Sequence, residues 1–427
     1  METVILETEY GKIKGLSYDD CDVFYGIPYA KPPVGSKRWR APEMAEPWQG
    51  ELDGTRFPNK CPQGELSGIP FYGKEFYDDP VFDPPASEDC LYLNVWKPKN
   101  IPDGSCPVLV WIHGGAFEQG HSCEKEFDGR GYAKRNVVFV SINYRLGPFG
   151  FLALPERYAE DGHTGNYGLL DQLMALRFLQ KTVSRFGGDP DQITIMGQSA
   201  GSFSAQALWA SPLGKGLFHQ VILMSGAGSW EGFPVEHSLE DAYSVTAELM
   251  RYLRIKTADE LEAKSSAEIL DAFQLMKQGR STLPVGPTVD GHVLPNSVVD
   301  LFRDGAVRSL PSMIGATSED ILWELPSESG KGRAFDQVLR INASLRDNHK
   351  TLPYLYYFGH GLPGSEDGAF HSSELWYVFG TLKRGWRPWT ERDYALADRV
   401  QDYIASFVKI GVPDPLTWNS NEPFLIS

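Results

Sequence analysis

The residue with the clearest chemical signal is Ser199, which stands in a tight glycine turn. Residues 197–201 have the sequence Gly-Gln-Ser-Ala-Gly, between a strand-like run at 192–196 and a helix-like run at 200–209. A GxSxG string predicts a nucleophile when a strand precedes it and a helix follows, because the sharp turn lifts the hydroxyl clear of the sheet. A glycine turn without chemistry is the alternative, and the correct flanks make it the weaker one.

A second small-residue loop offers backbone N–H groups. The apolar run 108–112 leads into Gly114 and Gly115, whose N–H groups have no side chain in the way, and Ala200 supplies a third donor. Acyl transfer needs such donors because negative charge develops on the carbonyl oxygen. Taken alone, the loop is an ordinary glycine turn. Beside Ser199 it predicts an oxyanion hole.

A buried sheet must carry both loops. Short apolar runs of strand length occur at 107–112, 137–143, 193–196, 221–224, 312–314 and 355–358. Helix-like segments occur at 168–186, 200–209, 239–253 and 391–410, the last stopped by Gly411. Buried strands that alternate with helices indicate a largely parallel sheet covered on both faces.

No internal repeat or low-complexity linker divides the chain, so residues 1–427 are predicted to form one catalytic domain. Residues 3–15 alternate and break at glycine, which is typical of a small antiparallel hairpin. Residues 31–90 are predicted to be a long ordered surface loop. Residues 231–283 look helical and are predicted to form a cap over the carboxyl edge of the sheet.

Composition excludes several classes of protein. The 427 residues include 40 basic and 56 acidic side chains, a net charge of −16, which argues against non-specific nucleic-acid binding. None of the five cysteines lies in a CxxC pair, so no metal or redox site is expected. No signal peptide is visible and the longest apolar runs are of strand length, so a cytoplasmic protein outside the membrane is predicted.

Further strings give the chain a family resemblance. They lie at residues 24–30, 32–35, 88–96, 143–145, 165–166 and 168–172. With the serine string, they resemble the type-B carboxylesterases, which include cholinesterases and bacterial p-nitrobenzyl esterases, nearly end to end. The resemblance implies an α/β-hydrolase fold, with a central, mostly parallel, twisted sheet flanked by helices.

The resemblance also implies a triad in the chain order serine, acid, histidine. Residues 368–375 look like the family's histidine loop, so His371 is the predicted general base. The two other histidines beyond the acid, His349 and His360, are the less favoured candidates.

The acid is where this sequence departs from the family, which usually has a glutamate in an Asp-Glu-Gly string. Residues 315–321 occupy that place here, and the spacing from Gly315 favours Asp320. Glu319, next to it, is the alternative acid. Because aspartate is one methylene shorter than glutamate, its loop must approach His371 more closely.

Structural roles for other residues are implied by the same resemblance. Two ion pairs, Arg38 with Glu88 and Arg145 with Asp171, are expected to pin loops around the site. Ser225 looks like a serine that supports the triad residues and is not itself the nucleophile.

The resemblance places Cys61 opposite Cys90, and in a cytosolic chain both are expected to be reduced thiols held close together. The loop between them lacks the tryptophan with which choline-binding relatives hold a quaternary ammonium, which counts against a choline ester. Its aromatic residues are Phe71, Tyr72, Phe76 and Tyr77. Its acidic residues, expected to be solvated, include Glu75, Asp78, Asp79 and Asp83.

The predicted function is that of a serine carboxylesterase acting on short-chain or aryl esters through an acyl-enzyme, with no metal or organic cofactor. The chain is shorter than is usual in the family, which implies a reduced cap and an open site. A non-catalytic adhesion or scaffold protein of the same fold is one alternative. A feruloyl-type plant-ester hydrolase is another, and it shares all these residues. Whether the protein is a monomer or a homo-oligomer is left open.

Overall fold

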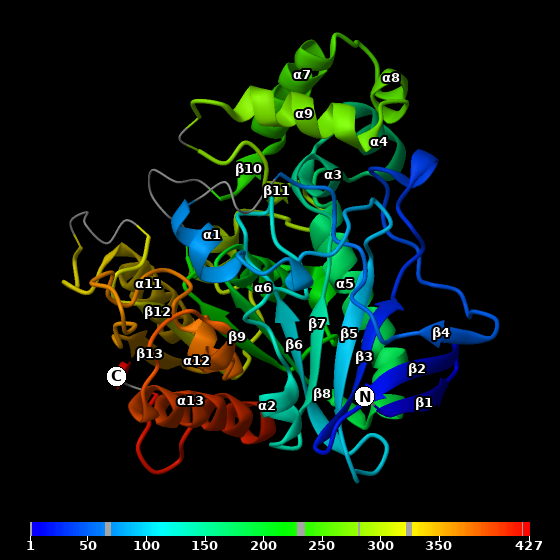
Figure 1. The fold of residues 1–427 in the computed structure, drawn as a ribbon. Helices are drawn as coiled ribbons and strands as arrows, with labels where there is room; N and C mark the ends of the chain where they lie inside the picture. Colours follow the sequence, from blue (N-terminus) through cyan, green and yellow to red (C-terminus); the bar gives the residue numbers. More distant parts are fainter. Residues whose placement is uncertain (1, 65–69, 229–234, 281, 322–326, 421) are drawn as a thin grey trace.

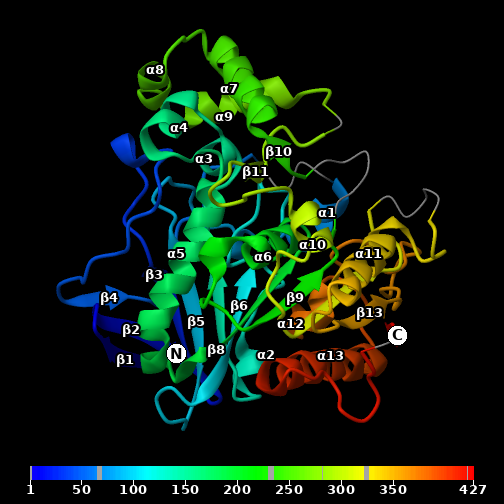
Figure 2. The same ribbon diagram turned by 180° about the vertical axis from the view of Figure 1, so that it is seen from behind.

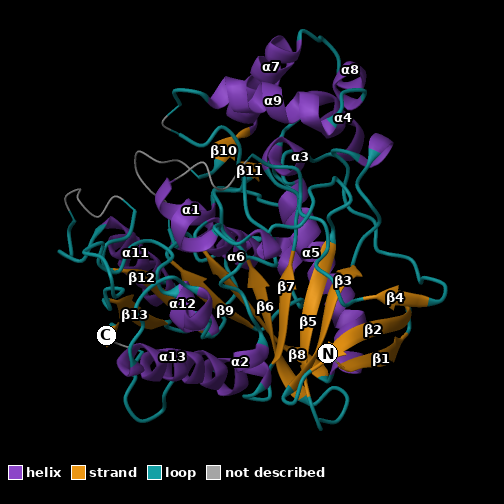
Figure 3. Ribbon diagram, in the orientation of Figure 1, coloured by secondary structure: helices purple, strands orange, loops and turns teal. Residues whose placement is uncertain are grey.

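The computed structural model describes residues 2–64, 70–228, 235–280, 282–321, 327–420 and 422–427. These residues build a twelve-stranded sheet in the order β1-β2-β3-β5-β7-β6-β8-β9-β12-β13-β14, with β4 beside β2 (Figure 3). In chain order the sheet strands are β1 (Glu2–Thr8), β2 (Gly11–Ser17), β3 (Cys21–Pro28), β4 (Glu51–Asp53), β5 (Tyr92–Pro98), β6 (Cys106–Ile112), β7 (Val138–Ile142), β8 (Gly188–Gln198), β9 (Gln220–Met224), β12 (Ser312–Thr317), β13 (Tyr354–Phe358) and β14 (Phe424–Ile426).

The sheet has a parallel half and an antiparallel half. Strands β7, β6, β8, β9, β12, β13 and β14 pair in parallel, whereas β1, β2, β3 and β5 form an antiparallel edge that begins with the predicted hairpin. The mostly parallel α/β sheet predicted from the sequence is therefore confirmed. Strand β5 joins the two halves through antiparallel pairing with β7.

Helices cover the sheet and extend beyond it (Figure 1). In chain order they are α1 (Pro70–Phe76), α2 (Arg130–Ala133), α3 (Gly147–Phe151), α4 (Pro155–Asp161), α5 (Tyr167–Thr182), α6 (Ala200–Ala210), α7 (Leu239–Leu253), α8 (Ala258–Glu262), α9 (Ser266–Lys277), α10 (Val298–Arg303), α11 (Arg333–Asp347), α12 (Leu375–Phe379) and α13 (Glu391–Ile410). The predicted helix at 168–186 is split, because α5 gives way to a 3-10 turn at Val183–Phe186.

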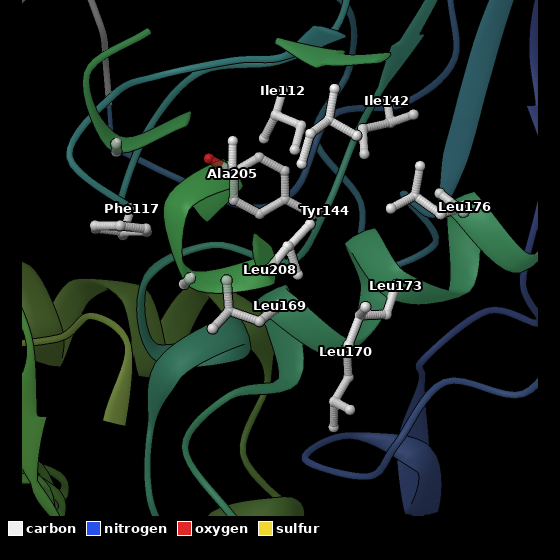
Figure 4. Packing of buried hydrophobic residues seen from close by; sticks show 14 of the residues in the cluster. Ile112, Phe117, Ile142, Tyr144, Leu169, Leu170, Leu173, Leu176, Ala205 and Leu208 are labelled. Carbon is white, nitrogen blue, oxygen red and sulfur yellow. The ribbon is translucent and has the colours of Figure 1, made fainter. Parts of the chain in front are cut away.

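Strand β6 shows why two layers of helices are needed. Alternate side chains of a strand point to opposite faces. Val110 and Ile112 pack into the same core as Leu173 of α5, and Figure 4 shows Ile112 in this packing. Trp111 packs instead into the core that contains Ile404 of α13. All five β6 residues from 108 to 112 are fully buried, so neither face of the strand can be left open to water.

Helices α7, α8 and α9 lie together beyond the carboxyl ends of the parallel strands, next to α3 and α4 (Figures 1 and 2). A short parallel pair, β10 (His237–Ser238) and β11 (Thr288–Val289), joins this group to the rest of the chain. The first residues of the predicted cap, 231–234, lie outside the described residues, as does residue 281. Within the described residues, no helix is both long and apolar enough to cross a membrane.

Several elements differ from the prediction. The region 31–90 was expected to be loop throughout, but it contains the short strand β4 and the helix α1. Helix α11 had no predicted counterpart, although residues such as Phe335, Val338 and Leu345 on one of its faces are buried. Its many polar residues obscure the apolar stripe in the sequence.

Candidate active site

The register of the parallel strands brings distant loops to one edge of the sheet. Ile112 of β6 lies opposite Gly197 of β8, so the loop at 113–117 begins beside the turn that holds Ser199. Met224 of β9 pairs with Gln198 on one side and with Gly315 of β12 on the other. The residues that follow all four strands therefore meet at the carboxyl edge, where ligands bind in sheets of this kind.

Ser199 occupies a strained turn between β8 and α6. Its φ of 55° and ψ of −126° are unusual for a residue with a side chain. The Ser199 N–H donates to the carbonyl of Met224 at 2.9 Å, which ties the turn to β9. A Cβ atom at Gly201 would lie 2.0 Å from the carbonyl oxygen of Ile112, so only glycine permits this close approach. Strain held in this way is typical of functional positions.

His371 and Asp320 form a direct contact, with 2.6 Å between Nδ1 and Oδ1. The second oxygen, Oδ2, accepts from the N–H of Thr317 at 3.2 Å and from its hydroxyl at 3.0 Å, so the carboxylate is fixed from both sides. The His371 proton on Nδ1 is thereby held by Asp320, which leaves Nε2 free to accept a proton.

In this pair, each partner shifts the pKa of the other in the direction opposite to the effect of burial. Burial raises the pKa of Asp320, but the His371 charge and the hydrogen bonds outweigh it, and the net pKa is lowered. Burial lowers the pKa of His371, but the Asp320 carboxylate outweighs it, and the net pKa is raised. The aspartate is therefore charged at neutral pH and stabilises the imidazolium form of its partner.

Ser199 and His371 line the same cavity. His371 Nε2 lies 3.4 Å from the side-chain Nε2 of Gln198, and the Ser199 hydroxyl has no hydrogen-bond partner among the residues that the structure describes. Catalytic hydrogen bonds are often long before substrate binds. The two groups are therefore placed in one cavity but are not joined.

The loop after β6 has an unusual backbone. Gly115, Ala116 and Phe117 have φ values of 101°, 56° and 62°, three left-handed residues in succession. A Cβ at Gly114 would lie 3.1 Å from the Cβ of Ser199, so glycine lets the loop come close to the serine. The N–H groups of residues 114–116 donate no hydrogen bond within the described part of the chain. The sequence did not single out Ala116 as a further N–H donor of this loop, because nothing local predicts a positive φ for alanine.

Glu319, the alternative acid, holds the histidine loop by its backbone. Its Oε2 accepts from the N–H of Ala369 at 2.7 Å and from the hydroxyl of Ser318, and Glu319 also forms a β-bridge with Phe370. In the structure its carboxylate therefore contacts the main chain of the histidine loop, and Asp320 contacts the imidazole.

A buried carboxyl group behind this pair was not singled out in the sequence. Glu374 is 2% exposed and accepts a hydrogen bond from the Ser225 hydroxyl at 3.3 Å. Burial and the nearby Asp320 charge raise its pKa to about 7. Ser225 has a φ of 50°, and its hydroxyl helps to lower the pKa of Asp320, so this serine lies beside both acids. Glu374 follows His371 by three residues, but sequence alone does not show that it points inward.

The raised pKa of Glu374 predicts a specific pH dependence of stability. Between its ordinary value near 4.5 and about 7, the unfolded chain has released the proton that the folded chain retains. The free energy of unfolding therefore falls as pH rises through this window, by about 3 kcal/mol from this group. We expect Glu374→Gln to remove that loss, because Gln keeps the acceptor for Ser225.

Urea denaturation of both proteins between pH 4.5 and 8 measures this difference. The stability of Glu374→Gln relative to the wild type should rise with pH up to about 7 and then level off. A constant difference across the range would contradict the assignment of a buried, protonated Glu374.

The cavity around Ser199 has a volume of about 360 Å³. Its apolar wall includes Tyr72 and Phe76 of α1, and the Tyr72 hydroxyl donates to the carbonyl of His371 at 3.1 Å. Phe71 packs edge-on against Phe370, with 4.9 Å between ring centroids. Helix α1 therefore both lines the cavity and supports the histidine loop.

The two predicted ion pairs are present in the structure. Arg38 donates from Nε to Glu88 at 2.6 Å, and from Nη1 to the carbonyls of Glu262 and Lys264 at 3.1 and 2.7 Å. It therefore ties the N-terminal loop to the end of α8. The second pair, Arg145 with Asp171, is bidentate, with bonds of 2.8 and 2.7 Å, and both side chains are almost fully buried.

The two cysteines of the aromatic loop lie together as free, buried thiols. Cys61 accepts a hydrogen bond from the N–H of Leu146 at 3.2 Å. Contact with the Cys61 thiol and burial both raise the pKa of Cys90. Their predicted proximity is thus observed.

The prediction that Glu75 is a solvated loop charge is wrong. Glu75 is 1% exposed and accepts from Arg387 Nε at 2.9 Å, Trp376 Nε1 at 2.8 Å and Trp386 Nε1 at 3.0 Å. The reason is that α1 turns this side chain inward, where the buried guanidinium of Arg387 needs a counter-charge.

The other two histidine candidates, His349 and His360, are not among the residues that line the cavity. His360 pairs instead with Asp393 at 3.0 Å.

The described residues contain no group of three or more histidine, cysteine, aspartate or glutamate side chains that could hold a metal ion. The chemistry that this arrangement supports comes from a hydroxyl, an imidazole with its carboxylate, and backbone N–H groups.

Comparisons with known proteins agree with this chemistry. The sequence profile of the Carboxylesterase family matches residues 2–339. The para-nitrobenzyl esterase of Bacillus subtilis (strain 168) is 39% identical over 459 residues, which cover 96% of this chain and 90% of that protein. The fumonisin B1 esterase of Sphingopyxis macrogoltabida is 35% identical over 344 residues, 80% of this chain and 59% of that protein.

Solved structures give the same result. A PNB esterase structure superposes with a TM-score of 0.85 at 31% identity, and covers 99% of this chain and 95% of its own. The carboxylesterase EST55 of Geobacillus stearothermophilus has a TM-score of 0.82 at 29% identity, with 99% and 96% covered.

Proposed function

Because this chain belongs to the carboxylesterase family and is a serine hydrolase of carboxylic esters, we propose that Ser199, His371 and Asp320 are its catalytic triad. The observation that carries the proposal is the 2.6 Å contact of Asp320 with His371, which lines the same cavity as Ser199. Glu319 has its carboxylate on the backbone of the histidine loop, which supports Asp320 over Glu319 as the acid.

The reaction begins when the Ser199 oxygen attacks the ester carbonyl while His371 Nε2 takes the hydroxyl proton. The carbonyl oxygen becomes an oxyanion, and the C–O bond to the alcohol breaks as His371 returns its proton to the leaving oxygen. A water molecule then repeats the sequence: His371 takes its proton, its oxygen attacks the acyl carbonyl, and the acid leaves as Ser199 regains its hydrogen. Asp320 stabilises the imidazolium in both halves.

The oxyanion donors are the backbone N–H groups of Gly114, Gly115 and Ala200, to which we add that of Ala116. Three observations support them: the loop 114–116 lines the cavity, its N–H groups are unused within the described chain, and Ala200 begins helix α6. The positive end of the helix dipole adds to this field.

Helices α7–α9 act as a reduced cap on a single catalytic unit. Lys277, the last residue of α9, lines the cavity, and Arg38 anchors the α8–α9 connection to the N-terminal loop. The cap thus contributes one charged side chain to the described wall. The cytoplasmic location stays a prediction.

Substrate size is the property that the cavity limits most directly. A volume of about 360 Å³ is near the lower end for ligand pockets, and part of its wall is aromatic. We expect p-nitrophenyl esters from acetate to hexanoate to be hydrolysed efficiently, and kcat/KM to fall by about tenfold or more at dodecanoate, because the longer chain remains outside.

An acyl-chain series of p-nitrophenyl esters, followed by the absorbance of the released nitrophenolate, measures this profile. Phenyl acetate and ethyl acetate, compared by acid release, test the predicted tolerance for aryl alcohols. A preference for long-chain triglycerides with little activity on short esters would contradict the proposal.

A further inference from the structure

The part of the cap that the structure describes reaches the catalytic cavity through one residue, Lys277, at the end of α9. Its ammonium group forms an ion pair with the carboxylate of Glu118, which lines the same cavity. Among the described residues, this is the one ion pair that joins α9 to the chain outside the cap, since Glu268 of α9 pairs with Lys264 inside it. The ester hydrolysis described above makes no use of the Lys277–Glu118 pair.

The burial of the two partners shows that Glu118 depends on Lys277. The Glu118 side chain is 8% exposed and that of Lys277 is 26% exposed. A carboxylate that is removed from water needs a counter-charge or hydrogen-bond donors. Within the described chain, Lys277 is the single ion-pair partner of Glu118. Because salt screens a partly buried pair less than an exposed one, the pair acts as a tether between the cap and the rest of the enzyme.

Glu118 belongs to the same tight turn as the oxyanion loop. Its N–H donates to the carbonyl oxygen of Gly115 at 3.0 Å, and the N–H of Gln119 donates to the same oxygen at 2.9 Å. A Cβ atom at Gly115 would lie 2.1 Å from the carbonyl oxygen of Gln119, which shows how closely this turn is packed. The carbonyl of Phe117 accepts from the N–H of Gly147 at 2.7 Å. Glu118 is therefore a fixed point on the body of the enzyme, to which the cap is fastened.

The opposite end of α9 is held to the body by an arginine. Arg38 donates to the carbonyls of Glu262 and Lys264, which lie just before α9. Helix α9 has 12 residues, so its two ends are about 18 Å apart. Because the first end is fixed in this way, the tether between Lys277 and Glu118 sets the position of the end that lies at the cavity.

We propose that Lys277 is a specificity-determining residue, whose ion pair with Glu118 holds the end of α9 at the cavity and so limits the length of the ester chain that the site accepts. The inference rests on the esterase function proposed above and deepens it. With the tether intact, Lys277 forms part of the cavity wall. Without it, the end of α9 is free to move outward, and a long acyl chain that otherwise extends into water is buried instead.

The ratio of kcat/KM for p-nitrophenyl dodecanoate to that for p-nitrophenyl hexanoate tests the proposal, because a ratio cancels any general loss of activity. Lys277→Met keeps a side chain of similar length but removes the ammonium, and Glu118→Gln removes the opposite charge. We expect each change to raise the ratio about tenfold. Lys277→Arg, which retains the charge, should keep the wild-type ratio to within about threefold. Labelling of Ser199 by a fluorophosphonate reports that each variant is folded.

A double variant separates a tether from two independent effects. If Lys277 and Glu118 act through one ion pair, Lys277→Met combined with Glu118→Gln raises the ratio no further than either change alone. Independent effects would multiply to about a hundredfold. Lys264→Met is the matched control, because this cap lysine has a similar side-chain exposure of 29% but pairs with Glu268 inside the cap. It should keep the wild-type ratio.

Each outcome supports or overturns the tether. An unchanged ratio in Lys277→Met, an equal rise in Lys277→Arg or Lys264→Met, or multiplied effects in the double variant would overturn it. A wild-type enzyme that hydrolyses dodecanoate as fast as hexanoate would also overturn it, and would leave the esterase assignment intact. If no p-nitrophenyl ester is hydrolysed and the fluorophosphonate does not label Ser199, the esterase assignment itself fails, which separates the two proposals.

Discussion

Ser199→Ala is expected to lower kcat for p-nitrophenyl acetate by about 10⁵-fold, because no other hydroxyl can attack the carbonyl from the turn. The residual rate should come from the backbone N–H groups of residues 114–116, which still stabilise the oxyanion when water attacks. Steady-state kinetics on the purified protein measure the loss. The fold should be retained, since the substitution removes one oxygen that has no hydrogen bond within the described structure.

Ser225→Ala is the matched control for this change. Ser225 is also a serine just after a parallel strand, with φ of 50° against 55° for Ser199, but its hydroxyl faces Glu374. We expect a fluorophosphonate probe to label Ser225→Ala and to leave Ser199→Ala unlabelled. Covalent labelling that survives Ser199→Ala would mean that another residue is the nucleophile.

Asp320→Asn is expected to lower kcat by about 10³- to 10⁴-fold, because asparagine no longer fixes the tautomer of His371 or stabilises its charged form. Loss of the carboxylate also removes the charge that raises the pKa of His371. The acid limb of the kcat/KM profile should therefore move to lower pH in the residual activity. A pH series from 5 to 9 with p-nitrophenyl acetate, corrected for nitrophenolate ionisation, measures both effects.

Glu319→Gln provides the comparison at the neighbouring position. Its Oε atom still accepts from the N–H of Ala369, so we expect kcat within about tenfold of the wild type and an unchanged acid limb. If Glu319→Gln instead causes the large loss and Asp320→Asn the small one, the two acids have been assigned in the wrong order.

Features that depend on neighbours along the chain could be predicted from the amino-acid sequence. The predicted helices at 239–253 and 391–410 have these bounds in the structure, because Ser238 and Gly411 cap them locally. The strands could be predicted from the apolar runs for the same reason, because the hydrophobic pattern of a strand extends over only a few residues. The turn around Ser199 was predictable because a strand, a serine between small residues and a helix lie within one short segment.

The contact between His371 and its acid depends on the folded chain, because Asp320 lies 51 residues away from His371 in the sequence. The spacing from Gly315 favoured Asp320 but left Glu319 as the alternative, because strand register and loop path turn one acid toward the imidazole and the other toward the backbone. The burial of Glu75, Glu118 and Glu374 was hidden for the same physical reason. A carboxyl group is buried or solvated according to what distant segments pack against it, and that packing depends on the complete fold.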